Sequence, residues 1–179
     1  MMDDRLRIMS FNVNGIRSRL HQLEQVVERY DPDILGLQET KVEDAAFPRE
    51  AVEALGFHMA IVGQKGHYGV ALLSKQPATT VQKGFDGDTE DAQRRFVAGR
   101  YRLQAGRELN VLNGYFPQGE SRNHEWKFPN KKKFYADVAA HLDRYHRPSE
   151  LVLLLGDMNV APGDKDVGIG EDNARRWLR

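Results

Sequence analysis

The sequence predicts an α/β protein built around a mixed β-sheet. Strand-like and helix-like apolar patterns follow one another along the chain; some strands alternate with helices, whereas others pair in hairpins. The most apolar segment, Leu151–Leu155, is typical of a buried strand, and we expect it at the centre of the sheet. The 179 residues contain no internal repeat, low-complexity tract or linker, so we expect a single domain over 1–179.

The first half of the chain predicts two helices among four strands. Apolar residues from Ile16 to Tyr30 recur at helical spacing, which indicates an amphipathic helix of about four turns. Asp31-Pro32-Asp33 stops this helix. In order, the expected elements are a strand over 6–13, a helix over 16–30, a strand over 34–37, a helix over 49–55, and paired strands over 57–62 and 68–74.

The second half predicts strands on either side of a long loop. Loops of such length with no structure of their own are often functional. Phe134, Val138 and Leu142 recur at helical spacing after that loop. In order, the expected elements are an acidic loop over 84–92, strands over 96–103 and 108–115, the long loop over 116–130, a helix ending before Pro148, the strand over 151–155, and a helix over 171–179.

The composition excludes several classes of protein. Apolar residues make up 40% of the chain and charged residues 29%, which is too apolar and too evenly charged for a disordered protein. No apolar run approaches the roughly 18–20 residues of a membrane span, and the N-terminus does not resemble a secretory signal. Cysteine is absent, so a disulfide scaffold and a thiolate metal site are excluded. We expect a cytoplasmic, bacterial-type location and no membrane partner.

The net charge is zero, but the charges are unevenly placed. Residues 31–54 contain seven acids and two bases, whereas residues 94–135 contain ten bases and three acids. A basic stretch beside an acidic one suggests a polyanionic ligand near a cation site. Two solvated faces of different charge are the alternative.

Three polar clusters follow predicted strands: Ser10–Gly15, Gly36–Lys41 and Leu155–Asn159. Strand ends gather at one edge of an open sheet and form its usual ligand crevice. Carboxylates and amides there provide oxygen ligands, which suit Mg²⁺, or alternatively Mn²⁺. The sequence therefore predicts a site for a hard divalent cation at this edge.

Taken singly, each of these residues also has a structural interpretation. Asn12 and Asn14 are common turn formers, and Glu39 can be an exposed loop residue. Tyr115 can be a core aromatic, or its hydroxyl can bind a phosphate oxygen. Lys131–Lys133 can serve only solubility. The clustering of acids and amides at three strand ends favours a site.

Several long motifs, in the same order, make the chain similar to the exonuclease III family of apurinic/apyrimidinic endonucleases. This family lies within the endonuclease/exonuclease/phosphatase superfamily. The resemblance covers nearly the whole chain from Ile8, and the matching stretches are Ser10–Gly15, Leu37–Lys41, Gly63–Leu72, Gln93–Arg95, Asn113–Arg122, Gly156–Asn159 and Asp166–Gly170 to the last residue.

The resemblance implies a four-layer α/β sandwich of two mixed sheets flanked by helices. It also implies a Mg²⁺-dependent nuclease of base-excision repair. Such an enzyme cleaves double-stranded DNA 5′ to abasic sites and removes nucleotides from 3′ ends.

The resemblance also assigns roles to five residues of the strand-end clusters. It implies that Glu39 is the main metal ligand and that Asn12 borders the metal. Tyr115 is expected to contact the scissile phosphate. Asp157 is expected to handle a proton, and Asn159 to orient Asp157 and the phosphate.

Four further residues are expected to contact DNA. The resemblance places Arg95 and Gln118 at the DNA. Tyr68 is an aromatic close to basic residues, and Lys127 lies in the basic stretch, a combination compatible with nucleic-acid contact.

One departure from the family pattern limits these expectations. The family carries a further C-terminal third with an Asp and a Ser-Asp-His segment, and this sequence ends before any such segment. We therefore expect an incomplete sandwich and a fragment or truncation of low intrinsic activity, from a protein that is monomeric at full length. The alternatives are an inactive DNA-binding fragment and a phosphatase or phosphodiesterase of the same superfamily.

Overall fold

A computed structural model of the chain describes residues 5–163, 166 and 168. The helix predicted over 171–179, and most of the family-like segment that begins at Asp166, lie outside the described residues. In the described part, no helix combines the length and the apolar character needed to cross a membrane.

Four strands of the described first half form one mixed sheet in the order β1-β2-β4-β3. β1 and β2 are parallel, because the chain returns through α1, whereas β4 is antiparallel to both β2 and β3. The elements are β1 (Ile8–Asn12), the 3-10 turn η1 (Ile16–Ser18), α1 (Leu20–Tyr30), β2 (Ile34–Gln38), the 3-10 turn η2 (Asp44–Ala46), α2 (Arg49–Ala54), β3 (His58–Val62) and β4 (Val70–Ser74).

Four strands of the described second half form another mixed sheet in the order β5-β6-β7-β8. β5, β6 and β7 are antiparallel neighbours, and β8 runs parallel to β7 after the chain returns through α3. The elements are β5 (Thr80–Lys83), β6 (Phe96–Arg102), the 3-10 turn η3 (Gln104–Gly106), β7 (Glu108–Tyr115), α3 (Lys127–Tyr145) and β8 (Leu151–Asp157).

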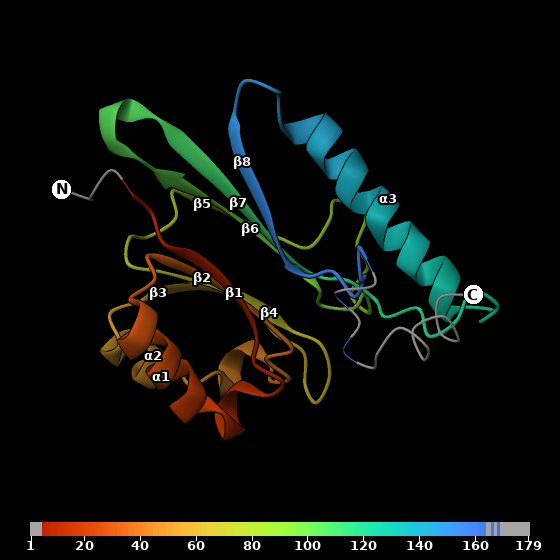
Figure 1. Cartoon of the computed structure of the whole chain (residues 1–179), viewed down its shortest axis with the longest axis horizontal. Helices are drawn as coiled ribbons and strands as arrows, with labels where there is room; N and C mark the ends of the chain where they lie inside the picture. Colours follow the sequence, from red (N-terminus) through yellow and green to blue (C-terminus); the bar gives the residue numbers. More distant parts are fainter. Residues whose placement is uncertain (1–4, 164–165, 167, 169–179) are drawn as a thin grey trace.

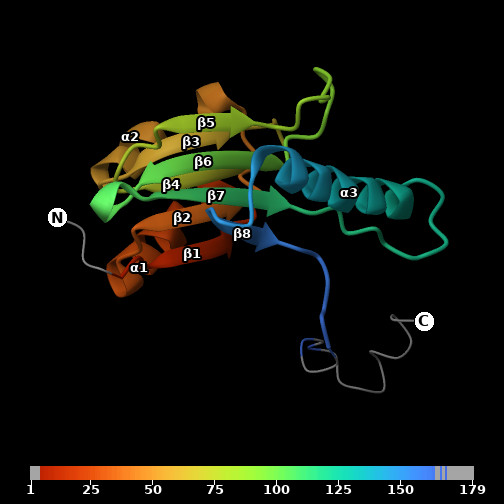
Figure 2. The same cartoon turned by 90° about the horizontal axis from the view of Figure 1, so that it is seen from above.

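The two sheets stack face to face between helices. Figures 1 and 2 show α1 and α2 outside the first sheet and α3 outside the second. Three apolar clusters fill the spaces between these four layers. On β2, Leu35 and Leu37 pack toward α1 and α2, whereas Ile34 packs toward the second sheet, as the two-residue period of a strand requires. The predicted α/β sandwich of two mixed sheets is confirmed.

A buried pair of carboxamides joins the two sheets. Nδ2 of Asn113, on β7, donates to the backbone carbonyls of Leu37 and Ala71 in the first sheet, each at 2.9 Å. Nε2 of Gln38 donates to Oδ1 of Asn113 at 2.7 Å. The side chains are buried, with Asn113 0% and Gln38 1% exposed. These bonds fix β2 and β7 against each other at one register.

Gly36 allows the sheets to approach at this point. A Cβ atom on Gly36 would lie 2.2 Å from Cδ1 of Leu155 and 3.1 Å from Cγ of Asn113. The side chains of the second sheet therefore occupy the space that any larger residue at this position of β2 would need.

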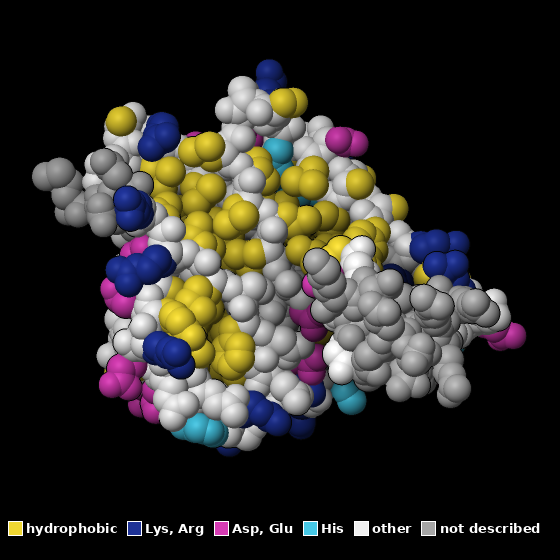
Figure 3. Space-filling view, viewed as in Figure 1, with side chains coloured by type: hydrophobic (Ala, Val, Ile, Leu, Met, Phe, Trp, Pro, Cys, Tyr) yellow, Lys and Arg dark blue, Asp and Glu magenta, His cyan; other side chains and the backbone are white. Residues whose placement is uncertain are grey.

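Among the described residues, Leu151–Leu155 does not take the central position that we expected. Its strand, β8, is an outer strand of the second sheet in the described part, and β1 is an outer strand of the first. Apolar side chains gather on the side of the molecule that Figure 3 faces, where β1 and β8 lie. Leu151, the first residue of β8, is exposed. The strand is apolar because one of its faces packs against the first sheet and the other packs against α3. Burial of both faces does not determine where a strand lies within its own sheet.

Three other expectations need correction. β5 was not predicted, because its residues are mostly exposed and carry no apolar alternation. The helix expected over 16–30 is a 3-10 turn followed by α1, which begins at Leu20. The long loop ends at Trp126, since α3 begins at Lys127 and accommodates Pro129 in its first turn. The hairpin of β3 and β4 is confirmed.

Replacing Asn113 by alanine should lower the free energy of unfolding by about 2–4 kcal/mol. The change leaves Gln38 and two buried carbonyl groups without their partner. Urea denaturation followed by circular dichroism measures the loss. Asn110→Ala on the same strand is the matched control, because Asn110 bonds to the partly exposed Arg100. Equal losses in the two variants would contradict a special role for the inter-sheet link.

His141 predicts a pH dependence of stability. It is 5% exposed, and its ring centroid lies 5.0 Å from that of Phe96. Burial, and next the nearby His146, lower the pKa of His141 below its ordinary value of 6.5. The unfolded chain then binds this proton more readily than the folded one, so stability falls as the pH drops through 6.5.

His141→Leu should weaken this dependence. We expect the difference in unfolding free energy between pH 7.5 and pH 5 to be smaller in the variant, as measured by urea titration at each pH. His21→Leu, at an exposed position of α1, should leave the difference unchanged. If the unfolding free energy of His141→Leu depends on pH as strongly as that of the parent protein, His141 is not the source of the pH dependence.

Candidate active site

The carboxyl ends of four strands from both sheets meet at one place. β1 lies parallel to β2, β7 lies parallel to β8, and β1 contacts β8 across the sandwich. Asn12 ends β1, Glu39 follows β2, Tyr115 ends β7 and Asp157 ends β8. The structure therefore brings together the strand-end residues that the sequence singled out.

The Asn12 side chain joins the two carboxylates of the site. Its Nδ2 donates to Oε1 of Glu39 and to Oδ2 of Asp157, each at 2.8 Å. Its Oδ1 accepts the backbone N–H of Asn14 at 3.0 Å, which fixes the plane of the amide. A neutral donor between two carboxylates weakens the repulsion between their negative charges.

Glu39 is held by three side chains. Besides the bond from Asn12, the ammonium of Lys41 lies 2.8 Å from Oε2, and the hydroxyl of Tyr115 also hydrogen-bonds to the carboxylate. Burial raises the pKa of Glu39, but the hydrogen bonds from Asn12, Lys41 and Tyr115 outweigh it and bring the pKa below its ordinary value of 4.5. Glu39 is therefore an anion at neutral pH.

Tyr115 rests on the guanidinium of Arg95. Cζ of Arg95 lies 4.5 Å from the ring centroid of Tyr115 and 4.1 Å from that of Tyr68. Burial raises the pKa of Tyr115 to about 12, helped by its hydrogen bond to Glu39 and by the charges of Glu39 and Asp157, and opposed by Arg95. The phenol therefore keeps its proton at neutral pH and remains a hydrogen-bond donor.

Arg95 is itself buried, with 8% of its surface exposed. Its Nη1 donates to the carbonyl of Tyr115 at 2.9 Å, and its Nε donates to Oε1 of Gln93 at 2.6 Å. In this arrangement Arg95 supports the two tyrosine rings. A direct contact of Arg95 with DNA stays a prediction.

Asn159 ties the loop after β8 to its surroundings. Its backbone N–H donates to Oδ1 of Asp157 at 3.1 Å, and its Nδ2 donates to the carbonyl of Phe116 at 2.8 Å. Nζ of Lys131, on α3, donates to the carbonyl of Asn159 at 2.6 Å. These bonds hold the Asp157 carboxylate in one orientation, and the expected role of Asn159 in the reaction stays a prediction.

The backbone around the site is strained. Of the non-glycine residues with positive φ, five lie at or beside the site, with φ between 44° and 57°: Asn14, Glu39, Lys41, Tyr68 and Asn159. Such a conformation costs about 1–3 kcal/mol at each residue and is typical of functional sites. Hydrogen bonds between the loops hold it, including those from Lys41 N–H to the Tyr68 carbonyl at 2.9 Å and from Gly15 N–H to the Glu39 carbonyl at 2.7 Å.

The other expected DNA contacts lie in different places. Tyr68 belongs to the centre of the site, 6.5 Å from Tyr115 between ring centroids. Gln118 and Lys127 do not join it: Gln118 is exposed on the loop after β7, and Lys127 begins α3 and pairs with Glu120.

Sequence reasoning gave no role to four residues that build the site: Lys41, Gln38, Asn113 and Gln93. Each of the four belongs to a stretch that matches the exonuclease III family, and this match was the signal that they shared. Gln38 and Asn113 are polar residues inside apolar strands, and such a position predicts a buried partner without saying which residue provides it.

The donor set fits a hard divalent cation. Glu39 and Asp157 offer carboxylate oxygens, and Nδ2 of Asn12 donates to both of them. Mg²⁺ in proteins takes one or two carboxylates and fills its remaining positions with water or substrate oxygens. The described residues contain no group of three or more His, Asp or Glu side chains that could hold a metal.

The chain is similar to known proteins over most of its length. The sequence profile of the Endonuclease/Exonuclease/phosphatase family matches residues 9–177. Exodeoxyribonuclease III of Haemophilus influenzae is 54% identical over 97% of this chain and 65% of its own length. A DNA-(apurinic or apyrimidinic site) endonuclease of Dictyostelium discoideum is 26% identical over 92% of this chain and 45% of its own length. The chain thus spans less than two thirds of these relatives.

Solved structures give the same result. An AP endonuclease from Archaeoglobus fulgidus superposes with a TM-score of 0.82 and 34% identity, covering 97% of this chain and 68% of that one. The 3′ phosphatase NExo from Neisseria, bound to a product DNA hairpin, superposes with a TM-score of 0.75 and 32% identity. This match covers 89% of this chain and 60% of that one. With the matched profile and the shared fold, this chain belongs to the endonuclease/exonuclease/phosphatase family.

Proposed function

We propose that this chain carries the centre of a Mg²⁺-dependent hydrolase of DNA phosphodiester bonds, which acts at abasic sites and at 3′ ends of duplex DNA. The observation that carries the proposal is the Asn12 amide bridging Glu39 and Asp157, with the Tyr115 hydroxyl on Glu39. The names of the similar proteins, an exodeoxyribonuclease III and two apurinic-site endonucleases, support the choice of substrate.

Hydrolysis of a phosphodiester requires three things of such a site. The phosphoryl oxygens gain negative charge, a water must lose a proton, and the departing 3′-oxygen must be stabilised as its bond to phosphorus breaks. A divalent ion on Glu39, bordered by Asn12, supplies charge neutralisation when bound. Because the pKa of Tyr115 is about 12, its hydroxyl keeps its proton at neutral pH and can donate it in a hydrogen bond to a phosphoryl oxygen.

Asp157 is the proposed proton carrier. The Asn12 amide on Oδ2 and the Asn159 N–H on Oδ1 hold its carboxylate in one orientation. A carboxylate positioned in this way can accept a proton from the attacking water or pass one to the leaving oxygen. The basic residues between 94 and 135 would bind the phosphates on either side, which makes binding weaken steeply with salt.

A phosphatase is the second candidate, favoured by one observation. The Neisseria structure that superposes on this chain is described as a 3′ phosphatase. Removal of a 3′-terminal phosphate from DNA needs the same charge neutralisation and proton transfer at one phosphorus atom. A duplex with a 3′-phosphate therefore belongs in every assay beside one with an abasic site.

Glu39→Gln and Asp157→Asn should each lower incision of an abasic duplex. We expect losses of about 10²–10³-fold and 10²–10⁴-fold respectively, because the first removes the anion that holds the cation and the second removes the proton carrier. Single-turnover rates with protein in excess make a low activity measurable. Glu43→Gln, at an exposed position near Glu39, is the matched control. Unchanged rates in both site variants would refute the assignment.

Metal removal gives an independent test. Incision should disappear in EDTA and return when Mg²⁺ is added in excess, because a site with only one or two carboxylates holds the ion weakly and depends on its free concentration. Duplex binding in EDTA with no incision at any Mg²⁺ concentration would instead favour an inactive DNA-binding protein. Hydrolysis of inositol phosphates without action on DNA would favour a different member of the superfamily.

A further inference from the structure

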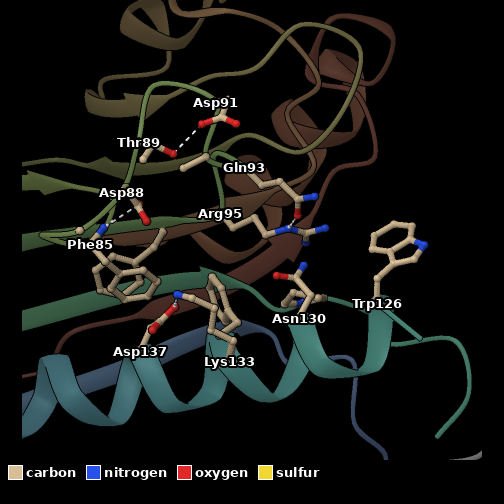
Figure 4. Close-up of a pocket in the computed structure, with 15 residues that line it drawn as sticks. Phe85, Asp88, Thr89, Asp91, Gln93, Arg95, Trp126, Asn130, Lys133 and Asp137 are labelled. Atoms are coloured by element: carbon tan, nitrogen blue, oxygen red, sulfur yellow. Dashed lines mark hydrogen bonds and ion pairs between the residues drawn. The ribbon is translucent and has the colours of Figure 1, made fainter. Parts of the chain in front are cut away.

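A groove of about 630 Å³ opens beside the site, between the acidic loop before β6 and the first half of α3. Figure 4 shows Arg95, Asn130 and Trp126 at one end of it and Phe85 at the other. Arg95 lines this groove and also contacts the ring of Tyr115, so the groove lies next to the proposed reaction centre. None of the roles assigned above uses it.

The inner part of the groove is aromatic. Phe85 stacks on Phe96 with ring centroids 4.4 Å apart, and Phe134 meets Phe85 edge-on at 5.4 Å. All three residues line the groove. Phe96 and Phe134 are buried, so Phe85 is the ring of the three that is partly open to the groove, and this end of the groove is apolar.

Two carboxamides lie at the end nearest the site. Gln93 accepts Nε of Arg95 at 2.6 Å through its Oε1, which leaves its amide hydrogens available. The Asn130 side chain makes no hydrogen bond to any other residue of the described part and lines the same end. Carboxamides of Asn and Gln match the donor and acceptor pattern on the edge of a nucleobase.

Trp126 stands at the mouth of the groove. It is 59% exposed, although a large aromatic side chain usually finds cover. Its ring meets His124 edge-on at 5.3 Å, and the Lys127 ammonium lies 5.6 Å from the ring centroid. An exposed tryptophan is a typical stacking platform for a nucleobase, and Lys127 beside it is paired with Glu120.

The charges in the groove indicate which part of a nucleotide enters. Asp88, Asp91 and Asp137 line it, against Arg95 and Lys133. Lys133 is already paired with Asp137 at 2.6 Å. These acids disfavour a phosphate, but they can accept hydrogen bonds from the amino groups of a base.

We propose that this groove holds one unstacked nucleobase of the bound DNA, with Trp126 stacked on it and Asn130 and Gln93 at its edge. The inference rests on the proposed function, because it needs DNA at the site. It adds a base-binding pocket to the contacts with phosphates that the proposed function requires.

Tryptophan fluorescence tests the proposal in EDTA, where no hydrolysis occurs. Trp177→Phe in every variant makes Trp126 the single tryptophan. Deoxyadenosine 5′-monophosphate should quench the emission of Trp126, whereas deoxyribose 5-phosphate should not. Equal effects of the two ligands would overturn base recognition.

Binding of a labelled duplex with one unpaired nucleotide supplies the second measurement. Trp126→Ala should weaken binding by about five- to a hundredfold, and Trp126→Phe by less than about threefold, because stacking survives in phenylalanine. Asn130→Ala should reduce the preference for the duplex over one with an abasic residue at that position. Tyr30→Ala is the matched control, since Tyr30 is 45% exposed at the far end of α1.

The outcomes separate the two proposals. Equal binding by Trp126→Ala and the parent, with Mg²⁺-dependent incision intact, overturns the base pocket and leaves the proposed function standing. No binding of any DNA by a folded parent protein overturns both. Thermal unfolding by circular dichroism verifies that each variant is folded.

Discussion

The Asn113 carboxamide is the contact on which the rest of the structure depends. It is fully buried between two sheets, and it bonds to two carbonyls and to Gln38 of the opposite sheet. Apolar packing alone lets two sheets slide over each other, because contacts between methyl groups have little direction. Hydrogen bonds have direction, and a buried donor without its partner costs about 1–3 kcal/mol. The link therefore sets the register of the sandwich, and Gly36 provides the room for it.

The site follows from that register. Its residues come from β1 and β2 on one side and from β7 and β8 on the other, so any shift between the sheets would separate Asn12 from Asp157. The strained loop residues add a second requirement. Glu39 and Tyr68 keep left-handed backbone only because neighbouring loops bond to each other. The carboxylates are thus placed by backbone that is held from several directions, which is how a site can be organised before its ligand arrives.

Much of this arrangement could be predicted from the sequence. Strand and helix periods identified most elements, and polar residues at the ends of apolar strands identified Asn12, Glu39 and Asp157, which the structure brings together. Pattern could not reveal the pairing of Asn113 with Gln38 or the support of two tyrosines by Arg95, because these contacts join segments far apart in the chain. The apolar pattern also led us to expect Leu151–Leu155 at the centre of its sheet, whereas β8 is an outer strand in the described part. Apolar residues show that both faces of a strand are covered, but the order of strands depends on the hydrogen bonds along their edges.

The bond between Asn12 and Asp157 spans 145 residues, and it has a consequence for how the protein comes into being. β8 can dock only after α3 has crossed back over the second sheet, so the two carboxylates meet at a late stage of folding. Contacts between residues so distant in sequence form slowly, because closing the loop between them costs entropy. A chain still emerging from the ribosome holds Glu39 without Asp157. The link from Glu39 through Asn12 to Asp157 therefore does not exist in the nascent chain until residue 157 has been made.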